Sequence, residues 1–435
     1  SFDRKDGKKA MKTKFLKILI STTLAVPFSA ISVLADTNNP AENSAMEDAA
    51  DDQKPVMLYE VSDEESEDNQ KLVNPALSGS DGVHWFLSVD NTLYIDAGKL
   101  ARSDTWRKYS SRIQRIRVVP KGDSRKLILP ENCEFLFSEL EALTDIDLSN
   151  FDTSHVKNMY GMFLNCCSLE NLDLSSLDTG RVENMGALFA GCSNLKNLNV
   201  CCIDTSHVKK MNSMFSSCSS LANLDLSHFN VDAVQNFSCM FSGCCSLQGI
   251  NLTSFFTFSA VDMSYMFSDC RSLTNVDVSY FDTSHVNSFQ GMFMWCRKMH
   301  YLDLSNFDTQ NVYDMQYMFT DCGSLESLDL SNFDTAKIKY DQSWYMYSGC
   351  SNLESINISK NYFKGYMAKN APHTEQAVWY QRDKQRNVKS WSEMAESWTD
   401  ENAGWWSLVH DSSRIDFETN GGTEFEPLTD LTGRN

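Results

Sequence analysis

The chain has 435 residues, of which 42% are hydrophobic, which is enough for a packed core. Its formal net charge is −20, and no stripe of basic residues appears along it. Binding to nucleic acid depends on Lys and Arg that displace phosphate counterions. The composition therefore excludes a nucleic-acid partner and, for the same reason, disfavours a bare anionic membrane surface.

Residues 1–35 have the pattern of a leader. Three lysines precede an apolar run from Ile18 to Leu34, and the segment ends in Val33-Leu34-Ala35. This is typical of a secretory signal peptide, with cleavage expected after Ala35 and no membrane insertion afterwards. A transmembrane anchor is the alternative, but Pro27 and several Ser and Thr residues weaken it. We expect a bacterial protein that is secreted or held at the cell surface.

Residues 36–75 are predicted to form a disordered acidic spacer. Between Asp36 and Gln70 there are twelve Asp or Glu and one Lys, with few large apolar residues. Such a segment cannot offset the entropy of ordering by burying apolar surface.

Residues 76–142 are predicted to form an N-terminal β cap. Apolar residues alternate from Trp85 to Ile95 around Asp90-Asn91, which predicts a hairpin. Trp106 and the apolar residues that follow it would close the open end of a stack of repeats, since a terminal repeat has no neighbour to cover its apolar face.

Residues 143–363 are organised by an internal repeat. An apolar residue recurs every 26 positions, and a two-residue insertion then delays the last copy to Leu353; the earlier copies are Leu143, Leu169, Leu195, Leu221, Leu247, Leu273, Met299 and Leu325. Repeats of this length stack into an elongated solenoid.

Each unit combines two periods. Leu169, Leu172 and Leu174 suit an extended segment with inward leucines, so neighbouring units are expected to pair as a parallel sheet. The spacing of Val182, Met185, Leu188, Phe189 and Cys192 predicts a helical or 3₁₀ return on the other face. The expected fold class is an α/β solenoid.

The repeat resembles the 26-residue leucine-rich repeat of the BspA-like bacterial surface proteins, with the signature LDLSxFDTSxVxxMxxMFxxC. The best copies run from Ile146 to Cys166 and from Leu302 to Cys322. This resemblance implies a leucine-rich-repeat solenoid, and an adhesin-type role in virulence toward host matrix proteins, host cells or other bacteria. Phe256, where Asp is usual, departs from the pattern.

Residues 364–414 hold five of the nine tryptophans and are predicted to form a C-terminal cap or small module. A sugar-binding aromatic platform is the alternative, and it needs exposed rings. Residues 415–435 resemble the start of a Listeria–Bacteroides surface repeat, with Asn420-Gly421 supplying a tight turn. We expect that module to be truncated, with a cell-wall anchor beyond it.

A slot in the repeat becomes a column in the stack, and one column consists of cysteines: Cys166, Cys192, Cys218, Cys244, Cys270, Cys296, Cys322 and Cys350. Equivalent Cβ atoms in adjacent strands lie about 4.8 Å apart, outside the usual disulfide window. We predict buried free thiols and neither a disulfide nor a zinc site.

A second column is the candidate binding site. It consists of Asp147, Asp173, Asp225, Asp277, Asp303 and Asp329, with Asn199 and Asn251 in two gaps. We call these eight residues the acidic ribbon. They occupy the outward slot of the predicted strands, and His300 and Tyr301 beside them are a candidate anchor. The ribbon is either a solvated face or a surface that recognises a basic or cation-bridged partner.

A third column of acidic residues lies at the turn after each strand: Asp152, Asp178, Asp204, Asp282, Asp308 and Asp334. Short oxygen-bearing side chains there are expected to cap backbone N–H groups, with calcium binding as the alternative. His155, His207 and His285 follow Ser in this motif, but neighbours in sequence do not make a catalytic triad. We predict a protein-binding protein that is not an enzyme and needs no cofactor or metal. A structural stalk and a carbohydrate-binding Trp-rich segment are the alternatives.

Overall fold

The computed structural model describes residues 57–60, 70–101, 105–338, 345–361, 378–382, 388–390, 393, 399 and 403–408. All of these belong to one compact unit, Gln53–Asn435. The predicted leader and the predicted module at 415–435 lie outside the described residues. Within the described ranges, no helix is long and apolar enough to cross a bilayer.

The N-terminal sheet has the strand order β1-β2-β3-β4-β6-β8. Its strands are β1 (Met57–Glu60), β2 (Gln70–Ser80), β3 (His84–Ser88), β4 (Thr92–Asp96), β6 (Arg115–Val119) and β8 (Asp145–Ile146). The predicted hairpin is confirmed, because β3 pairs antiparallel with β4 and Asn91 takes a left-handed φ of 62° in the turn. From β4 onward the pairing is parallel, so the stack begins before Leu143.

Strands β1 and β2 correct part of the predicted disordered spacer. Residues Met57–Glu60 pair antiparallel with residues 70–73, and Val73 also pairs with Ser88 of β3. The acidic composition suggested disorder, but here the backbone adds its hydrogen bonds to an existing sheet edge. The remainder of 36–75 lies outside the described residues.

The N-terminal core closes the first coils with aromatic rings. Trp85 and Trp106 are fully buried and meet edge to face, with ring centroids 6.2 Å apart. Trp106 then stacks on Phe137 at 6.1 Å. The 3₁₀ helix η1 (Thr105–Tyr109) positions Trp106 for these contacts. Trp106 therefore packs on the first ring of the phenylalanine stack that runs into the coils.

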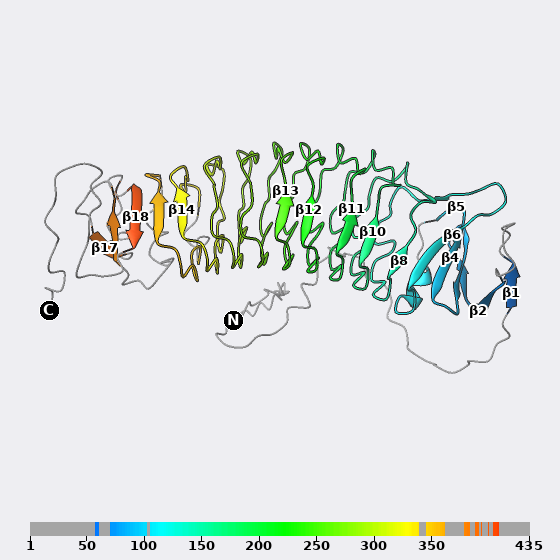
Figure 1. The fold of residues 1–435 in the computed structure, drawn as a ribbon. Coiled ribbons are helices and arrows are strands. Elements are labelled where there is room, and N and C mark those ends of the chain that lie inside the picture. The colour runs from blue at the N-terminus through cyan, green and yellow to red at the C-terminus, as the bar shows by residue number, and fades with distance from the viewer. Residues whose placement is uncertain are drawn as a thin grey trace, which may run out of the picture. The chain divides into compact units, whose positions relative to one another are not determined.

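The repeat strands pair in parallel and in register, as predicted. β10 (Asn171–Asp173) pairs with β11 (Asn197–Asn199), which places Leu172 opposite Leu198. β12 (Asn223–Asp225) pairs with β13 (Gly249–Asn251) in the same way, and β14 (Ser327–Leu330) pairs with β15 (Ser355–Ile358). Figure 1 shows these strands side by side along a row of coils. The 26-residue spacing thus brings equivalent residues together.

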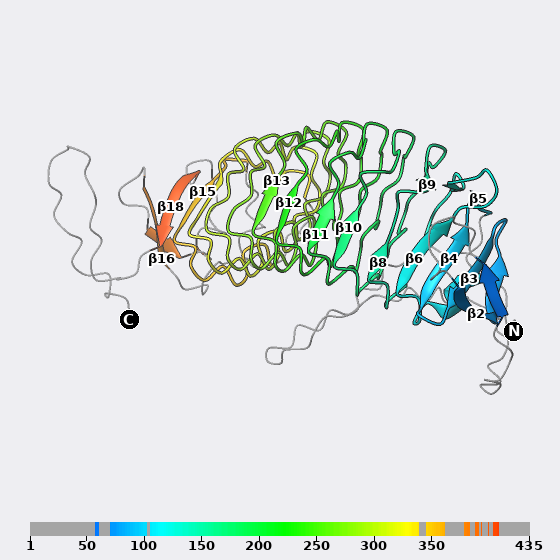
Figure 2. The same cartoon turned by 45° about the vertical axis from the view of Figure 1, so that its right-hand side comes forward.

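A second parallel ladder runs along the returns without interruption through eight coils. It links one residue of each coil to the next, from Asn132 through Asn158, Asn184, Lys210, Asn236, Asp262 and Ser288 to Asp314. Beyond each bridge, alternate N–H groups donate to the following coil, as from Met159 to the Asn184 carbonyl at 2.9 Å and from Phe163 to the Leu188 carbonyl at 3.0 Å. The turned view in Figure 2 shows these coils as successive loops.

The predicted helical or 3₁₀ returns are not formed in the described coils. Within the described coils, each return is a run of overlapping turns, closed in the first repeat by N–H groups of Met162, Leu164 and Cys166 that donate to carbonyls three residues earlier. Two residues of each return have positive φ, such as Gly161 at 58° and Asn165 at 58°. A helix cannot include such residues at regular intervals. Turns with i to i+3 contacts reproduce the apolar spacing that predicted a helix.

The two left-handed positions recur in every coil. The first column is Phe135, Gly161, Ala187, Ser213, Cys239, Tyr265, Gly291, Tyr317 and Tyr345; the second is Glu139, Asn165, Gly191, Ser217, Gly243, Asp269, Trp295, Asp321 and Gly349. At Gly291, an added Cβ would lie 2.5 Å from the ring of Tyr265 in the preceding coil. Glycine is needed there for its conformation and for its lack of a side chain.

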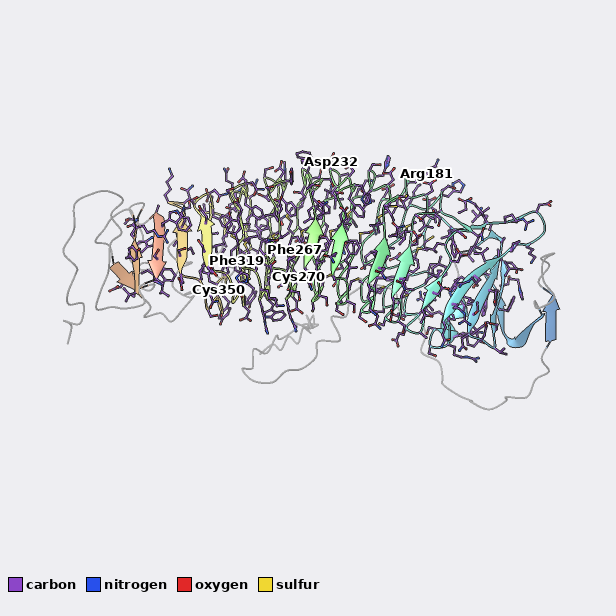
Figure 3. All side chains as sticks on the ribbon, in the orientation of Figure 1. Arg181, Asp232, Phe267, Cys270, Phe319 and Cys350 are labelled. Carbon is purple, nitrogen blue, oxygen red and sulfur yellow. The ribbon has the colours of Figure 1, made fainter. Side chains whose placement is uncertain are left out.

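Phenylalanine rings stack through the interior. Phe189, Phe215 and Phe241 are fully buried, with successive centroids 5.6 Å apart. Phe267, Cys270, Phe319 and Cys350 lie within the coils in Figure 3, whereas Arg181 and Asp232 project at the upper edge. The core is therefore continuous from coil to coil, so no coil buries its apolar face alone.

The C-terminal strands join the sheet of the last coils, in the order β14-β15-β18-β16-β17. β18 (Gly404–Leu408) pairs antiparallel with β15 of the last coil, and β16 (Val378–Gln381) and β17 (Val388–Ser390) follow. Trp379 and Trp406 are fully buried. The described part of the Trp-rich segment thus covers the end of the stack.

The remaining short strands, β5 (Gly98–Lys99), β7 (Leu127–Ile128) and β9 (Phe151–Asp152), form a separate parallel sheet.

Candidate functional site

The acidic ribbon lies along the outward face of the repeat strands. Leu172 points into the core while Asp173 is exposed, and the same alternation holds for Leu224 and Asp225. Asp147, Asp173, Asp225, Asp277 and Asp303 are exposed, and Asp329 is half-buried. Strand pairing places Asp173 opposite Asn199 and Asp225 opposite Asn251. The predicted column is therefore a column in space.

Each ribbon side chain is held by the turn that follows its strand. The backbone N–H of Ser175 donates to Asp173 Oδ1 at 2.9 Å, and the N–H of Ser305 donates to Asp303 Oδ1 at 2.9 Å. The same bond, from the residue two positions later, forms in every coil of the ribbon. Asp and Asn favour such local turns, which fixes the side chains in one orientation.

These hydrogen bonds keep the ribbon charged. The pKa values of Asp147, Asp173 and Asp225 lie below the usual aspartate value, first because a serine backbone N–H stabilises each ionised carboxylate. The pKa of Asp277 is also lowered, first by the hydroxyl of Ser279 and then by its N–H. These four groups are anionic at neutral pH.

Asparagine separates carboxylates within the ribbon. Asn199 Nδ2 donates to Asp173 Oδ1 at 2.9 Å, and Asn197 Nδ2 donates to Asn171 Oδ1 at 2.6 Å beside it. An amide between two carboxylates reduces like-charge repulsion and adds a donor. A shallow groove of about 1100 Å³ lies over this part of the sheet, and its lining includes Asp173 and Asn199 of the ribbon, neighbouring asparagines and Lys196.

The proposed anchor lies beside the ribbon. Tyr301 is 63% exposed, and its alternating pattern of burial with Leu302 places it on the same face as Asp303. His300 is exposed, and its Nδ1 lies 3.9 Å from a carboxylate oxygen of Glu326. The structure therefore brings Tyr301 and Asp303 onto one surface.

The third column has the predicted structural role. Asp204 Oδ1 accepts the N–H of Ser206 at 2.9 Å, and Asn230 makes the equivalent bond to the N–H of Asp232 at 3.0 Å. Thr179 Oγ1 donates to the Asp204 carbonyl and accepts the Asp204 N–H, linking adjacent coils. These residues cap turns rather than helices. Among the described residues, no group of three or more metal-ligating side chains is gathered.

The Ser-His pairs do not assemble a triad. Ser206 Oγ lies 3.1 Å from His207 Nδ1, but Asp204 accepts the backbone N–H of Ser206 rather than an imidazole N–H. Both side chains are exposed at a turn. A catalytic triad requires the acid to orient the histidine, and these contacts do not do so.

The predicted free thiols are confirmed. All eight column cysteines are buried and unpaired. Each thiol donates to the carbonyl of a residue one coil back, as from Cys244 to Phe215 at 3.1 Å. Burial raises the pKa of Cys218 to about 12, and the same cause raises the pKa of the other thiols in the column.

One surface feature was not predicted. Phe256 and Phe258 are 41% and 53% exposed, and Phe256 meets Tyr280 edge to face at 5.7 Å. Phe256 stands where other coils have Asp or Asn, and Phe258 stands where they have small or polar residues. The departure at Phe256 was the signal for this apolar patch.

With the coils and their columns established, comparison with known proteins places the chain. A family model described as "Mycoplasma protein of unknown function, DUF285" matches residues 131–255 and 261–391, which is more than half of the sequence. The chain belongs to the DUF285 family. The first DUF285 match begins one residue before Asn132, where the continuous ladder starts. The gap between the matches contains Phe256 and Phe258.

Solved structures with similarity to this DUF285 chain include three leucine-rich repeat proteins. One from Bacteroides ovatus ATCC 8483 is 12% identical, with 64% of this chain and 88% of that chain covered and a TM-score of 0.33. One from Eubacterium ventriosum ATCC 27560 is 14% identical, with 61% and 92% covered and a TM-score of 0.25. A leucine rich cell surface protein from Faecalibacterium prausnitzii A2-165 is 14% identical, with 69% and 99% covered and a TM-score of 0.20. Likenesses at these TM-scores do not establish function. A search of curated proteins gave no significant match.

Proposed function

We propose that this protein binds other proteins through the acidic ribbon, and that it acts outside the cell as an adhesin of the BspA-like type. The observation that supports this most directly is the row of carboxylates, each fixed by a turn hydrogen bond, in which the lowered pKa values of Asp173 and Asp225 keep these two groups anionic at neutral pH. Groups already held in one orientation lose little freedom on binding.

The ribbon suits a basic protein surface. Complementary charge across an interface steers association and sets specificity. Tyr301 adds a large, exposed ring beside the carboxylates, and tyrosine is common among residues that dominate binding energy. Proteins of the host matrix, host cells or other bacteria that present Lys and Arg are the expected partners. Binding of this kind needs neither catalysis nor a cofactor.

Export is part of the proposal. It rests on the lysines and the apolar run before Ala35. Expression of the whole chain in a bacterium, followed by mass spectrometry of the surface fraction, should give a mature N-terminus at Asp36. Retention of residues 11–35 on a cytoplasmic protein would refute export without bearing on the ribbon.

The ribbon can be tested by neutralising its charge without breaking its turns. Asn199 and Asn251 already occupy the column and make the same hydrogen bond, so Asp→Asn is compatible with the fold. The variant carries this change at Asp173, Asp225, Asp277 and Asp303. Its control carries it at Asp178, Asp204, Asp282 and Asp308, where Asn230 shows that asparagine also caps the turn.

Both variants lose four charges, so a non-specific effect of net charge would weaken them equally. Exposed charge pairs contribute about 0.2–1 kcal/mol each, so four pairs contribute about 0.8–4 kcal/mol and predict roughly a fourfold or greater loss of affinity. Affinity for a panel of extracellular-matrix proteins, measured by biolayer interferometry, should fall for the ribbon variant and not for the control. Equal affinities for both would contradict the proposal. Absence of binding by the unaltered chain would favour a structural stalk.

The carbohydrate alternative finds less support. Trp379 and Trp406 are buried, and Arg382 covers the ring of Trp405 at 5.4 Å from its centroid. Rings in these positions do not offer a stacking face to a sugar. Trp391 and Trp398 lie outside the described residues.

A further inference from the structure

Cys201 and Cys202 differ from the other cysteines of this chain. All fourteen cysteines lie in the described residues, and these two alone are exposed. They are neighbours in sequence, and they occupy the turn that follows β11. Other coils place serine at the position of Cys201, as at Ser175 and Ser227. The pair is therefore a specific feature of one coil.

The turn brings the two sulfur atoms into contact. Cys201 Sγ lies 3.2 Å from Cys202 Sγ, and either thiol can donate to the other. The N–H of Ile203 donates to the Val200 carbonyl at 3.1 Å, which places both cysteines at the centre of the turn. The N–H of Cys201 also donates to Asn199 Oδ1 at 3.2 Å. The backbone thus holds the thiols together on the surface.

We propose that Cys201 and Cys202 form a thiol–disulfide exchange site that closes reversibly into a disulfide between neighbouring residues. The oxidant is a small disulfide, written RSSR. The Cys201 thiolate attacks one sulfur of RSSR, breaks its S–S bond and releases RS⁻. The Cys202 thiolate then attacks the sulfur of Cys201 in the mixed disulfide and releases the second RS⁻. Two protein thiols are oxidised, RSSR is reduced to two RSH, and the two protons pass to these leaving groups.

The order of attack follows from the contact between the thiols. The pKa of Cys202 is raised, first by its hydrogen bond with Cys201 and next by the charge on Cys201. Since the thiolate is the reactive form, this makes Cys202 a poorer first nucleophile than an ordinary cysteine, and we assign the first attack to its neighbour.

The closed pair should reopen readily. Neighbouring Cα atoms are about 3.8 Å apart, whereas ordinary disulfides join Cα atoms about 4.4–6.8 Å apart. A bond formed outside that range is strained and easily reduced. The site thus suits reversible exchange better than permanent cross-linking.

The column thiols do not share this chemistry. The eight column thiols are buried, and each already donates to a carbonyl, as Cys192 does to Phe163 at 3.2 Å. Burial also raises their pKa values, as for Cys350 to about 12. They provide an internal standard of unreactive cysteines in the same molecule.

The test treats the folded, reduced full chain with oxidised glutathione, followed by alkylation and peptide mass spectrometry. The peptide with Cys201 and Cys202 should become lighter by two hydrogens, and both residues should become unavailable to N-ethylmaleimide. A dithiol reductant should restore labelling of both. A mixed disulfide that persists, a disulfide-linked dimer through these residues, or two unchanged thiols would each overturn the proposal.

Single-cysteine variants separate the exchange steps. Cys201→Ser restores the residue of other coils and leaves Cys202 able to form only a mixed disulfide. Its peptide should therefore gain the mass of one glutathione, and that glutathione should not be displaced by a second cysteine. Cys202→Ser tests the same step at Cys201 and provides a second variant if the first does not fold. Ring-type mass loss in either variant would show that another cysteine is the partner and would refute the assignment.

Discussion

Ser217→Gly tests the conformation of the returns, because a run of turns and a helix predict changes of opposite sign in the stability of the protein. It has a φ of 60°, in the same column as Gly191 and Gly243 of the adjacent coils. A left-handed conformation costs a non-glycine residue roughly 1–2 kcal/mol. Glycine removes that cost but loses more backbone entropy on folding, roughly 0.5–1 kcal/mol. Ser217→Gly is therefore expected to stabilise the protein by about 0.5–1 kcal/mol.

A helical return would give the opposite sign. In a helix interior, replacing serine by glycine destabilises by about 0.5 kcal/mol. The neighbouring Ser216 is absent from the positive-φ residues, so Ser216→Gly is a matched control that should destabilise by about 0.5–1 kcal/mol. Urea midpoints of the two variants, compared at equal m-values, measure both changes. A lower midpoint for Ser217→Gly than for the unaltered protein would refute the turn-based return.

Three further predictions concern the core, the ribbon and the buried thiols. Phe215→Ala removes a fully buried ring that stacks on Phe189 and Phe241 and should lower the free energy of unfolding by about 3–5 kcal/mol. Phe256→Ala, at a ring that is 41% exposed, is the control and should lower it by less than about 1 kcal/mol. Similar urea midpoints for both variants would contradict the stacked core. Because the folded-state pKa values of Asp147, Asp173, Asp225 and Asp277 are lowered, their stabilisation is present above the unfolded value of about 3.9 and is lost as pH falls through the lower folded values. The midpoint of thermal unfolding, measured from pH 6 to pH 2, should therefore begin to fall near about pH 5. The fall should be shallower when all four residues are changed to Asn. An unchanged dependence on pH would show that these four groups do not contribute to it. Iodoacetamide at pH 8 should label the eight column cysteines only after unfolding, and rapid labelling of the native chain would show that they are accessible.

The parallel sheet could be predicted because its signal is strict. Leucines at fixed positions in units of equal length can pair only in register, and Leu172 does lie opposite Leu198. The outward position of Asp173 followed from the two-residue period of a strand. The same reasoning placed the acidic ribbon and the cysteine column, because both are consequences of the repeat length.

The returns could not be predicted from apolar spacing alone. Met185, Leu188 and Cys192 are three or four residues apart both in a helix and in a run of overlapping turns. The distinguishing signal is the recurrence of Gly, Asn, Asp or Ser at the second left-handed position, as at Asn165, Gly191 and Ser217. Trp295 obscures this signal at the same position, because bulky residues rarely adopt positive φ.

The first coils escaped prediction for a different reason. The strands β4 and β6 pair Leu93 with Ile116, and β6 and β8 pair Ile116 with Ile146. These intervals differ from 26 residues, so no sequence period connects them with the later repeats. The aromatic patch around Phe256 was also missed, because in the sequence it is a single departure from the repeat. Only the structure shows that Phe256, Phe258 and Tyr280 are exposed and in contact.

The acidic ribbon and the cysteine column exist only if coils of equal length stack so that equivalent residues become neighbours. The most direct measurement is the sulfur anomalous signal in a crystal of this protein. Eight peaks from Cys166 to Cys350 should form one row, with successive peaks at about 5 Å, close to the spacing of paired strands. Peaks of these eight cysteines scattered through the molecule, or a row interrupted between coils, would contradict the stacking on which the acidic ribbon and its proposed function depend.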